Sequence, residues 1–189
     1  PLSSSVEAFS AREGQTQMAV EVARTMGAGG VLVVEAGTGI GKTFAYLIPA
    51  LLGGERVLLS TATKALQDQL FKRDIPHLLA ALGLNARVAL LKGRSSYLCL
   101  HRLGEARLHP QSGVPAVSRQ LAQIEIWAQS TRSGDLAELE HVDEEAPSLP
   151  LVSSTRDNCL GARCAHAQAC HVNQARREAL AADLVVVNH

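Results

Sequence analysis

The residues with the clearest chemistry lie within 31–43, which reads VLVVEAGTGIGKT. Its glycines let the backbone curl so that several N–H groups converge on one anion. The Lys42 ammonium can reach the β- and γ-phosphates of a nucleotide, and the Thr43 hydroxyl can ligate Mg²⁺. We therefore expect an ATP and Mg²⁺ site in which Lys42 and Thr43 act catalytically. Its residues are Ala36, Gly37, Thr38, Gly39, Ile40, Gly41, Lys42 and Thr43.

The elements around this loop must present it to the phosphates. Val31–Val34 is apolar without alternation, which predicts a strand buried on both faces. The apolar run after Thr43 extends to Leu52 and predicts a helix, whose positive dipole end would face the anion. Ala36 stands where the strict pattern G-x-x-x-x-G-K-[ST] has glycine, and alanine is small enough for the turn. The alternative is a glycine-rich turn that binds nothing.

Two polar residues precede the loop. Arg12 and Gln15 lie at the start of a helix predicted over Gln15–Met26, with apolar residues at helical spacing. In motor ATPases a glutamine upstream of the phosphate loop recognises the adenine edge. We expect Arg12 and Gln15 to contact ATP, the alternative being two ordinary surface side chains.

Further strands are expected at Arg56–Ser60 and Ala86–Leu91, with a helix between them that runs to about Leu79. Hydroxyl groups and a lysine follow the first of these strands, in the sequence STATK of residues 60–64. Such a strand end, next to a helix N-terminus, receives phosphate oxygens well. Ser60, Thr61 and Lys64 are candidate contacts to a nucleic-acid backbone, and a plain capped helix is the alternative.

The alternation of strands and helices stops after Leu91 and returns only at Leu184–Val187. The simplest architecture is an α/β P-loop (RecA-like) domain with a parallel sheet and a small, mostly helical insertion. The first part of the domain would occupy residues 1–91, the insertion residues 92–182, and the returning strand residues 183–189. A helix at Val117–Ser130 is expected within the insertion.

All four cysteines of the chain lie in this insertion, as C-x59-C-x4-C-x5-C. Four thiolates can hold zinc or an iron–sulfur cluster. The gaps are wider than the tight knuckles typical of zinc, so the spacing favours an iron–sulfur centre and leaves Zn²⁺ as the alternative. His166 and His171 are either extra zinc ligands or surface histidines. The four cysteines are Cys99, Cys159, Cys164 and Cys170.

Composition excludes some classes of protein. The 189 residues carry 18 basic and 18 acidic side chains, so net charge does not indicate a partner. Nine basic residues against three acidic ones fall within 56–107, which permits a polyanion-binding surface. No run approaches the ~20 apolar residues of a membrane span, and the N-terminus is no secretory signal. We expect a cytoplasmic protein without a membrane partner, and the initial Pro1 suggests a piece of a longer chain.

Several stretches occur in a specific order. They are REGQTQMA, VVEAGTGIGKT, LSTATKALQDQL, LLKGRSSYLC, DNCLG with its following cysteines, and DLVVVNH. In that order they closely resemble the bacterial DinG/YoaA family of iron–sulfur DNA helicases, relatives of XPD in superfamily two. The resemblance covers essentially the whole chain.

This resemblance implies a function. Arg12 and Gln15 would sense adenine, residues 37–43 would be motif I, and Ser60–Lys64 would be motif Ia, which touches the DNA backbone. The four cysteines would hold a 4Fe–4S cluster, and Arg94 would be a further DNA contact. Because the family is bacterial, the resemblance also implies a nucleoid-associated protein. The parent would unwind duplex DNA 5′ to 3′ in repair or replication, acting on single-stranded or forked DNA. Repair or replication proteins would be its partners, and an oligomer is not expected.

Parts of the family pattern are missing from this chain. Motif II supplies the carboxylates for Mg²⁺ and water, and the nearest match, Asp143–Ala146, lacks both the preceding strand and the final histidine. Val185–His189 reads as the strand before motif II. The second RecA-like domain is absent, so the chain resembles the first third of a helicase and should be inactive alone. Tyr97 is either a stacking face for a base or core packing.

Two other functions compete with a helicase. The chain could be a non-motor P-loop ATPase or kinase with a structural zinc site. It could also be a redox-responsive DNA-binding module in which the cluster acts as the sensor. Stimulation of the ATPase by single-stranded DNA separates the first alternative from a helicase, and a change of DNA affinity on oxidation would support the second.

Overall fold

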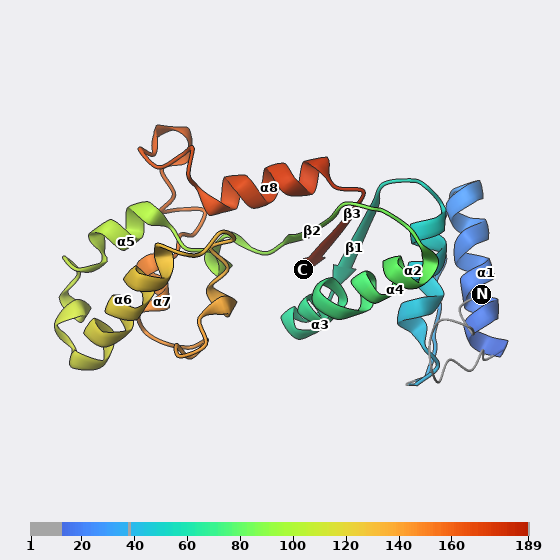
Figure 1. The fold of residues 1–189 in the computed structure, drawn as a ribbon, viewed down its shortest axis with the longest axis horizontal. Coiled ribbons are helices and arrows are strands. Elements are labelled where there is room, and N and C mark those ends of the chain that lie inside the picture. Colours follow the sequence, from blue (N-terminus) through green and yellow to red (C-terminus); the bar gives the residue numbers. More distant parts are fainter. Residues whose placement is uncertain (1–12, 38, 189) are drawn as a thin grey trace. The chain divides into compact units, whose positions relative to one another are not determined.

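The computed structural model describes residues 13–37 and 39–188. The chain divides into two compact units (Figure 1). The first unit comprises residues 1–90 and 181–189, and the second comprises residues 91–180. The insertion expected from the sequence was 92–182. Two of the expected nucleotide contacts, Arg12 and Thr38, lie outside the described residues.

The first unit contains a three-stranded sheet and the helices that pack with it. A π-helical turn, Leu70–Asp74, joins its third and fourth helices. The elements are α1 (Glu13–Ala28), α2 (Lys42–Leu52), β1 (Val57–Thr61), α3 (Lys64–Gln69), α4 (Ile75–Leu82), β2 (Val88–Leu91) and β3 (Leu184–Asn188).

The strand order of the sheet is β1-β3-β2, and β1 runs parallel to β3 with Val57 opposite Leu184 and Thr61 opposite Asn188. The returning strand β3 therefore lies in the centre. Its continuous apolar sequence suits this position, since Val186 is fully buried. The edge strand β1 alternates instead, and the side chain of Leu58 is 69% exposed. The strands expected near residues 56–60, 86–91 and 184–187 are thus confirmed, with bounds shifted by a residue or two.

One expected strand is wrong. Val31–Val34 is not paired with any strand among the described residues. Val31 is 91% exposed and Val33 is 89% exposed. A strand depends on hydrogen bonds to a neighbour and on cover for its faces. The described strands form their own three-stranded sheet and none of them pairs with this apolar run, which stays open to solvent.

The core of the first unit lies between the helices and the central strand. Each of α2, the π-helical turn and α4 contributes apolar side chains that are fully buried. The expected helix to about Leu79 is present, but it is divided by the π-helical turn and ends at Leu82. The residues of this cluster are Leu47, Leu70, Ile75, Leu78, Leu184 and Val186.

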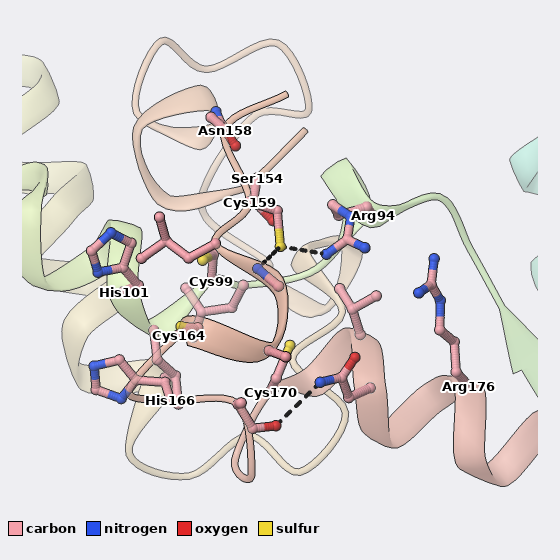
Figure 2. Close-up of a pocket in the computed structure, with 18 residues that line it drawn as sticks. Arg94, Cys99, His101, Ser154, Asn158, Cys159, Cys164, His166, Cys170 and Arg176 are labelled. Atoms are coloured by element: carbon pink, nitrogen blue, oxygen red, sulfur yellow. Dashed lines mark hydrogen bonds between the residues drawn. The ribbon is translucent and has the colours of Figure 1, made fainter. Parts of the chain in front are cut away.

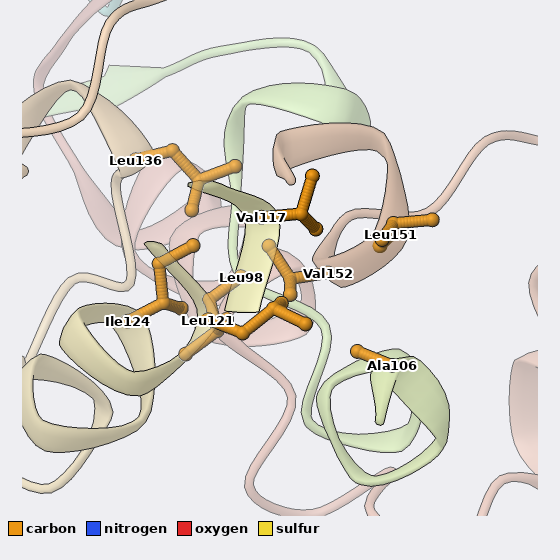
Figure 3. Packing of buried hydrophobic residues seen from close by; sticks show 8 residues of the cluster. All are labelled: Leu98, Ala106, Val117, Leu121, Ile124, Leu136, Leu151 and Val152. Atoms are coloured by element: carbon orange, nitrogen blue, oxygen red, sulfur yellow. The ribbon is translucent and has the colours of Figure 1, made fainter. Parts of the chain in front are cut away.

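The second unit is mostly helical and has its own core (Figure 3). Its helices are α5 (Leu100–Ala106), α6 (Pro115–Ala128), α7 (Leu149–Val152) and α8 (His171–Ala181). The helix expected at Val117–Ser130 is α6, which buries Val117, Leu121 and Ile124 along one face. No helix in residues 13–37 or 39–188 combines the length and hydropathy that crossing a bilayer requires.

Candidate functional site

The loop before α2 has the backbone geometry of an anion-binding turn. Gly39 and Gly41 adopt φ of 78° and 84°, the left-handed region that favours glycine. Gly41 is the N-cap of α2 and no side chain caps the helix there. Its carbonyl accepts from the amides of Phe44 and Ala45. The first turn of α2 therefore begins directly at Lys42 and Thr43, as expected from the sequence.

The Lys42 side chain lies over the loop that precedes it. Its Nζ donates to the carbonyl oxygens of Ala36 and Gly37, both at 2.8 Å. An ammonium has three N–H donors, so a bond to a phosphate oxygen is compatible with these two contacts. The structure thus places the cation at the loop, where it would neutralise phosphate charge.

Thr43 is the second residue of α2, and its side chain hydrogen-bonds to Tyr46 one turn later. Burial raises the pKa of the Tyr46 hydroxyl, and the bond to Thr43 partly offsets that rise. The neutral phenol therefore persists well above neutral pH and holds the Thr43 hydroxyl that was expected to ligate Mg²⁺.

Gln15 contacts the same loop from α1. Its side chain is buried, and Nε2 donates to the carbonyl of Gly41 at 3.1 Å. The φ of 84° at Gly41 favours glycine there, and a Cβ atom would also require the Gln15 amide to shift. The structure places the amide of Gln15 on the loop backbone, and its contact with adenine stays a prediction.

One of the expected nucleic-acid contacts, Thr61 at the end of β1, faces inward. Thr61 is only 4% exposed, and its Oγ1 donates to the carbonyls of Thr63 and Val187. Ser60 and Lys64 are exposed. Asn188, which carried no signal in the sequence, donates from Nδ2 to the carbonyl of Thr61 at 3.0 Å. Of the three candidates in this turn, Ser60 and Lys64 are accessible and Thr61 fixes the turn.

The four cysteines converge in the second unit. They line one cavity of about 310 Å³ together with Arg94, His101 and His166 (Figure 2). All four are half-buried free thiols, none in a disulfide. Cys99 directly precedes α5 and Cys170 directly precedes α8. Sulfurs from sequence positions far apart thus meet at one cavity.

The cavity brings a guanidinium to one of the sulfurs. Arg94 Nη1 donates to Cys159 Sγ at 2.9 Å, and the amide of Gly161 donates to the same sulfur at 3.4 Å (Figure 2). The structure places the Arg94 guanidinium against this cysteine, and the expected contact of Arg94 with DNA stays a prediction. Hydrogen bonds of this kind stabilise a thiolate.

The two histidines near the cysteines differ from each other. His166 is exposed at the cavity, whereas His171 is buried, so its interpretation as a surface histidine is wrong. Burial lowers the pKa of His171, and a hydrogen bond to the Arg132 backbone partly opposes this. The ring packs against Gly134, where a Cβ would clash with the His171 ring. His171 is therefore a packing residue of the scaffold.

Tyr97 is 3% exposed and packs beside Val172 and Ala175, so core packing is its role and a stacking face for a base is excluded.

Asp143–Ala146 forms a turn in which the Asp143 carboxylate accepts from the Glu145 amide. It does not follow a strand, which agrees with its rejection as motif II.

Comparison with known proteins identifies the family. Residues 13–128 match the DEAD/DEAH box helicase family. The whole chain is 45% identical to ATP-dependent DNA helicase YoaA of Haemophilus influenzae and covers 29% of it. Over 94% of its length it is 39% identical to ATP-dependent helicase DinG of Mycobacterium tuberculosis, of which it covers 30%. The whole chain is 31% identical to 3'-5' exonuclease DinG of Bacillus subtilis and covers 20% of it.

The chain therefore spans less than a third of each of these relatives. The resemblance to the DinG/YoaA proteins that the motifs predicted is confirmed, and the family match extends from α1 through α6, across part of both compact units. This chain belongs to the DEAD/DEAH box helicase family.

Proposed function

We propose that the chain is the nucleotide-binding and cluster-binding part of an ATP-dependent DNA helicase. The observation that carries this is the convergence of Cys99, Cys159, Cys164 and Cys170 on one cavity in a chain that also has a DEAD/DEAH-type phosphate loop. A metabolite kinase needs no such cavity. The YoaA and DinG relatives named as ATP-dependent helicases support the same assignment.

The nucleotide site divides its roles among three residues. Lys42 neutralises charge on the β- and γ-phosphates from its position over the loop. Thr43 holds Mg²⁺, with its hydroxyl oriented by Tyr46. Gln15 donates to the Gly41 carbonyl and so lies beside the loop, from where it would contact the adenine of the nucleotide. Hydrolysis itself requires the motif II carboxylates and the second domain, so this chain alone binds ATP without turning it over.

A 4Fe–4S cluster and zinc make different demands on the four cysteines. Each iron of such a cluster takes one cysteine sulfur, so the four sulfurs must surround a volume. Zinc would need all of them about 2.3 Å from a single point. Across residues 13–37 and 39–188, no group of three or more His, Cys, Asp or Glu is arranged to hold a metal ion, so our preference for a cluster rests on the cysteine spacing and on the resemblance to the family. The cluster would supply one-electron redox chemistry and would cross-link the loop that bears Cys159 and Cys164 to the rest of the unit.

DNA is the proposed substrate, contacted by Ser60 and Lys64 at the end of β1. Both residues are exposed: Ser60 lies near the end of β1 and Lys64 follows it, and Thr61 and Asn188 fix the backbone between them. Translocation from 5′ to 3′ and a role in repair rest on the resemblance to the family.

Metal analysis of this chain tests the proposal first. Anaerobic purification should give about four irons and four sulfides per chain, with a broad absorption band near ~400 nm. Stoichiometric zinc without colour would overturn the proposed cluster and favour the alternative of a non-motor ATPase.

In the full-length protein, single-stranded DNA should stimulate ATP hydrolysis. An ATPase rate that does not respond to DNA would overturn the proposed helicase function.

A further inference from the structure

The segment that carries Cys99 is held from both sides. Tyr97 bridges Asp135 and Leu98 bridges Ser153, both in antiparallel fashion. The Leu98 amide donates to the Gly134 carbonyl at 2.8 Å, and the Cys99 amide donates to the Val152 carbonyl at 2.7 Å. These bonds define one register of residues 97–99 against two neighbouring segments.

That register decides where the Cys99 sulfur points. Successive side chains of an extended segment face opposite sides, and a slip of one residue exchanges them. Leu98 packs into the apolar cluster of α6, whereas Tyr97 packs beside Cys170 in a separate cluster. Leu98 also lines the cavity, but in a shifted register the Cys99 sulfur would face the apolar cluster and lose its present position beside the other three cysteines.

A buried ion pair lies at this point of the fold. Lys92 Nζ is 2.7 Å from Asp135 Oδ2, and their side chains are 3% and 8% exposed. Asp135 is the bridge partner of Tyr97, and the Lys92 amide donates to the Tyr97 hydroxyl at 3.0 Å. Asp135 Oδ1 also accepts from the Ala137 amide at 3.1 Å. The pair therefore joins both sides of the segment before Cys99.

A buried ion pair adds little stability over an apolar pair, but any arrangement that separates the two charges is strongly disfavoured. We propose that Lys92 and Asp135 are positioning residues that set the register of residues 97–99 and so direct Cys99 into the cavity. The proposal rests on the cluster-binding function proposed above. Neither Lys92 nor Asp135 lines the cavity, so the pair would act on the metal site only indirectly, through the position of Cys99.

The test compares two neutralised pairs in the 189-residue chain. K92M/D135N removes both charges, leaves no unpaired charge, and keeps an oxygen to cap Ala137. R107M/E125Q neutralises an exposed pair in the same unit and serves as the matched control. We expect K92M/D135N to fold with a nearly unchanged melting temperature but to lose iron to a chelator about 10-fold faster, while the control loses it at the wild-type rate.

Amide hydrogen exchange in the metal-free chain gives a second readout. The Leu98 and Cys99 amides should be protected in the wild type and in the control, and should lose protection in K92M/D135N. Wild-type iron retention and wild-type protection in K92M/D135N would overturn the proposal. So would a failure of K92M/D135N to fold, because the pair would then be a general stabiliser. If the wild type itself holds no cluster, the proposed function fails, and amide exchange alone decides the register.

Discussion

Arg94 donates a hydrogen bond from Nη1 to Cys159 Sγ at 2.9 Å, across 65 residues of sequence. This contact puts a permanent positive charge against one of the four candidate cluster ligands. The amide of Gly161 adds a second donor to the same sulfur. Donors to a ligand sulfur and nearby positive charge favour the reduced, more negative state of a cluster.

Replacing Arg94 should therefore lower the reduction potential of the bound cluster. In R94M we expect a fall on the order of tens of millivolts, because one charged donor is lost while the four cysteines remain. Redox titration followed by electron paramagnetic resonance measures it. R177M is the matched control, since Arg177 lies exposed on α8 and does not line the cavity. Equal potentials in R94M and R177M would show that the contact has no electronic effect.

Lys42 lies at the phosphate loop and far from the cysteines in sequence. We expect K42A to lower ATP hydrolysis by the full-length protein by about 100-fold or more, since a donor to transferring phosphoryl oxygens is lost. The iron content and the visible absorption should stay at the wild-type level. Parallel ATPase and absorption measurements check both, and a joint loss would mean that the substitution had unfolded the protein.

Two glycines of the second unit should respond oppositely to alanine. Gly134 has φ of 65°, and a Cβ there would clash with the buried His171 ring. G134A should therefore destabilise the unit by about 2 kcal/mol or more. Gly104 lies within α5, and nothing is within 4 Å of its added Cβ. G104A should stabilise the unit by about 0.5–1 kcal/mol.

Urea unfolding followed by tryptophan fluorescence measures both, because the single tryptophan, Trp127, packs against the core of this unit. Destabilisation of similar size in G104A and G134A would refute the role assigned to the Gly134–His171 contact.

Because of the ion pair between Arg107 and Glu125, we expect the stability of the fold to depend on pH. The bidentate contact has both N···O distances at 2.9 Å and lowers the pKa of Glu125, chiefly through this hydrogen bond. A carboxyl with a lowered folded-state pKa stabilises the fold above its unfolded value of 4.5. That stability disappears as the pH falls through the folded-state pKa. We expect E125Q to flatten the dependence of stability on pH below about 4.5, with a small amplitude because the pair is exposed.

Thermal melts between pH 3 and pH 7, roughly the range over which carboxyl groups titrate, measure this change. R107M should flatten the curve in the same way, since it removes the partner that lowers the pKa. A pH profile of E125Q identical to that of the wild type would contradict the prediction.

The sequence predicted elements whose signals are local and missed contacts made across the chain. The strand Leu184–Asn188 and the helix α6 follow from apolar patterns within a few residues. The convergence of the cysteines followed from their spacing and from the resemblance. No local pattern links Arg94 to Cys159 or Asn188 to Thr61, since these pairs form only when the chain has folded.

For the apolar run Val31–Val34 the sequence-based prediction was wrong for a different reason. The local pattern of a strand is strong, but none of the described strands pairs with it. A run without alternation predicts burial on both faces, but Val31 and Val33 are almost fully exposed. Exposed, unpaired, β-branched segments promote association between chains. The relatives are more than three times as long, and the remainder of such a chain could supply the missing neighbour.

We therefore expect polar substitutions in this segment to reduce self-association of the 189-residue chain but to destabilise the full-length protein. V31T/V33T keeps the β-branched shape and replaces one methyl group of each side chain by a hydroxyl. In this 189-residue chain it should reduce self-association, measured by light scattering, and leave the melting temperature unchanged. In the full-length protein, where we expect the run to be buried, the same substitutions should lower the free energy of unfolding by about 2 kcal/mol or more, because two hydroxyls lose water. L58T on the edge strand β1 removes another exposed apolar side chain and serves as the control. Equal effects of V31T/V33T in the two chains would mean that Val31–Val34 is solvent-exposed in both.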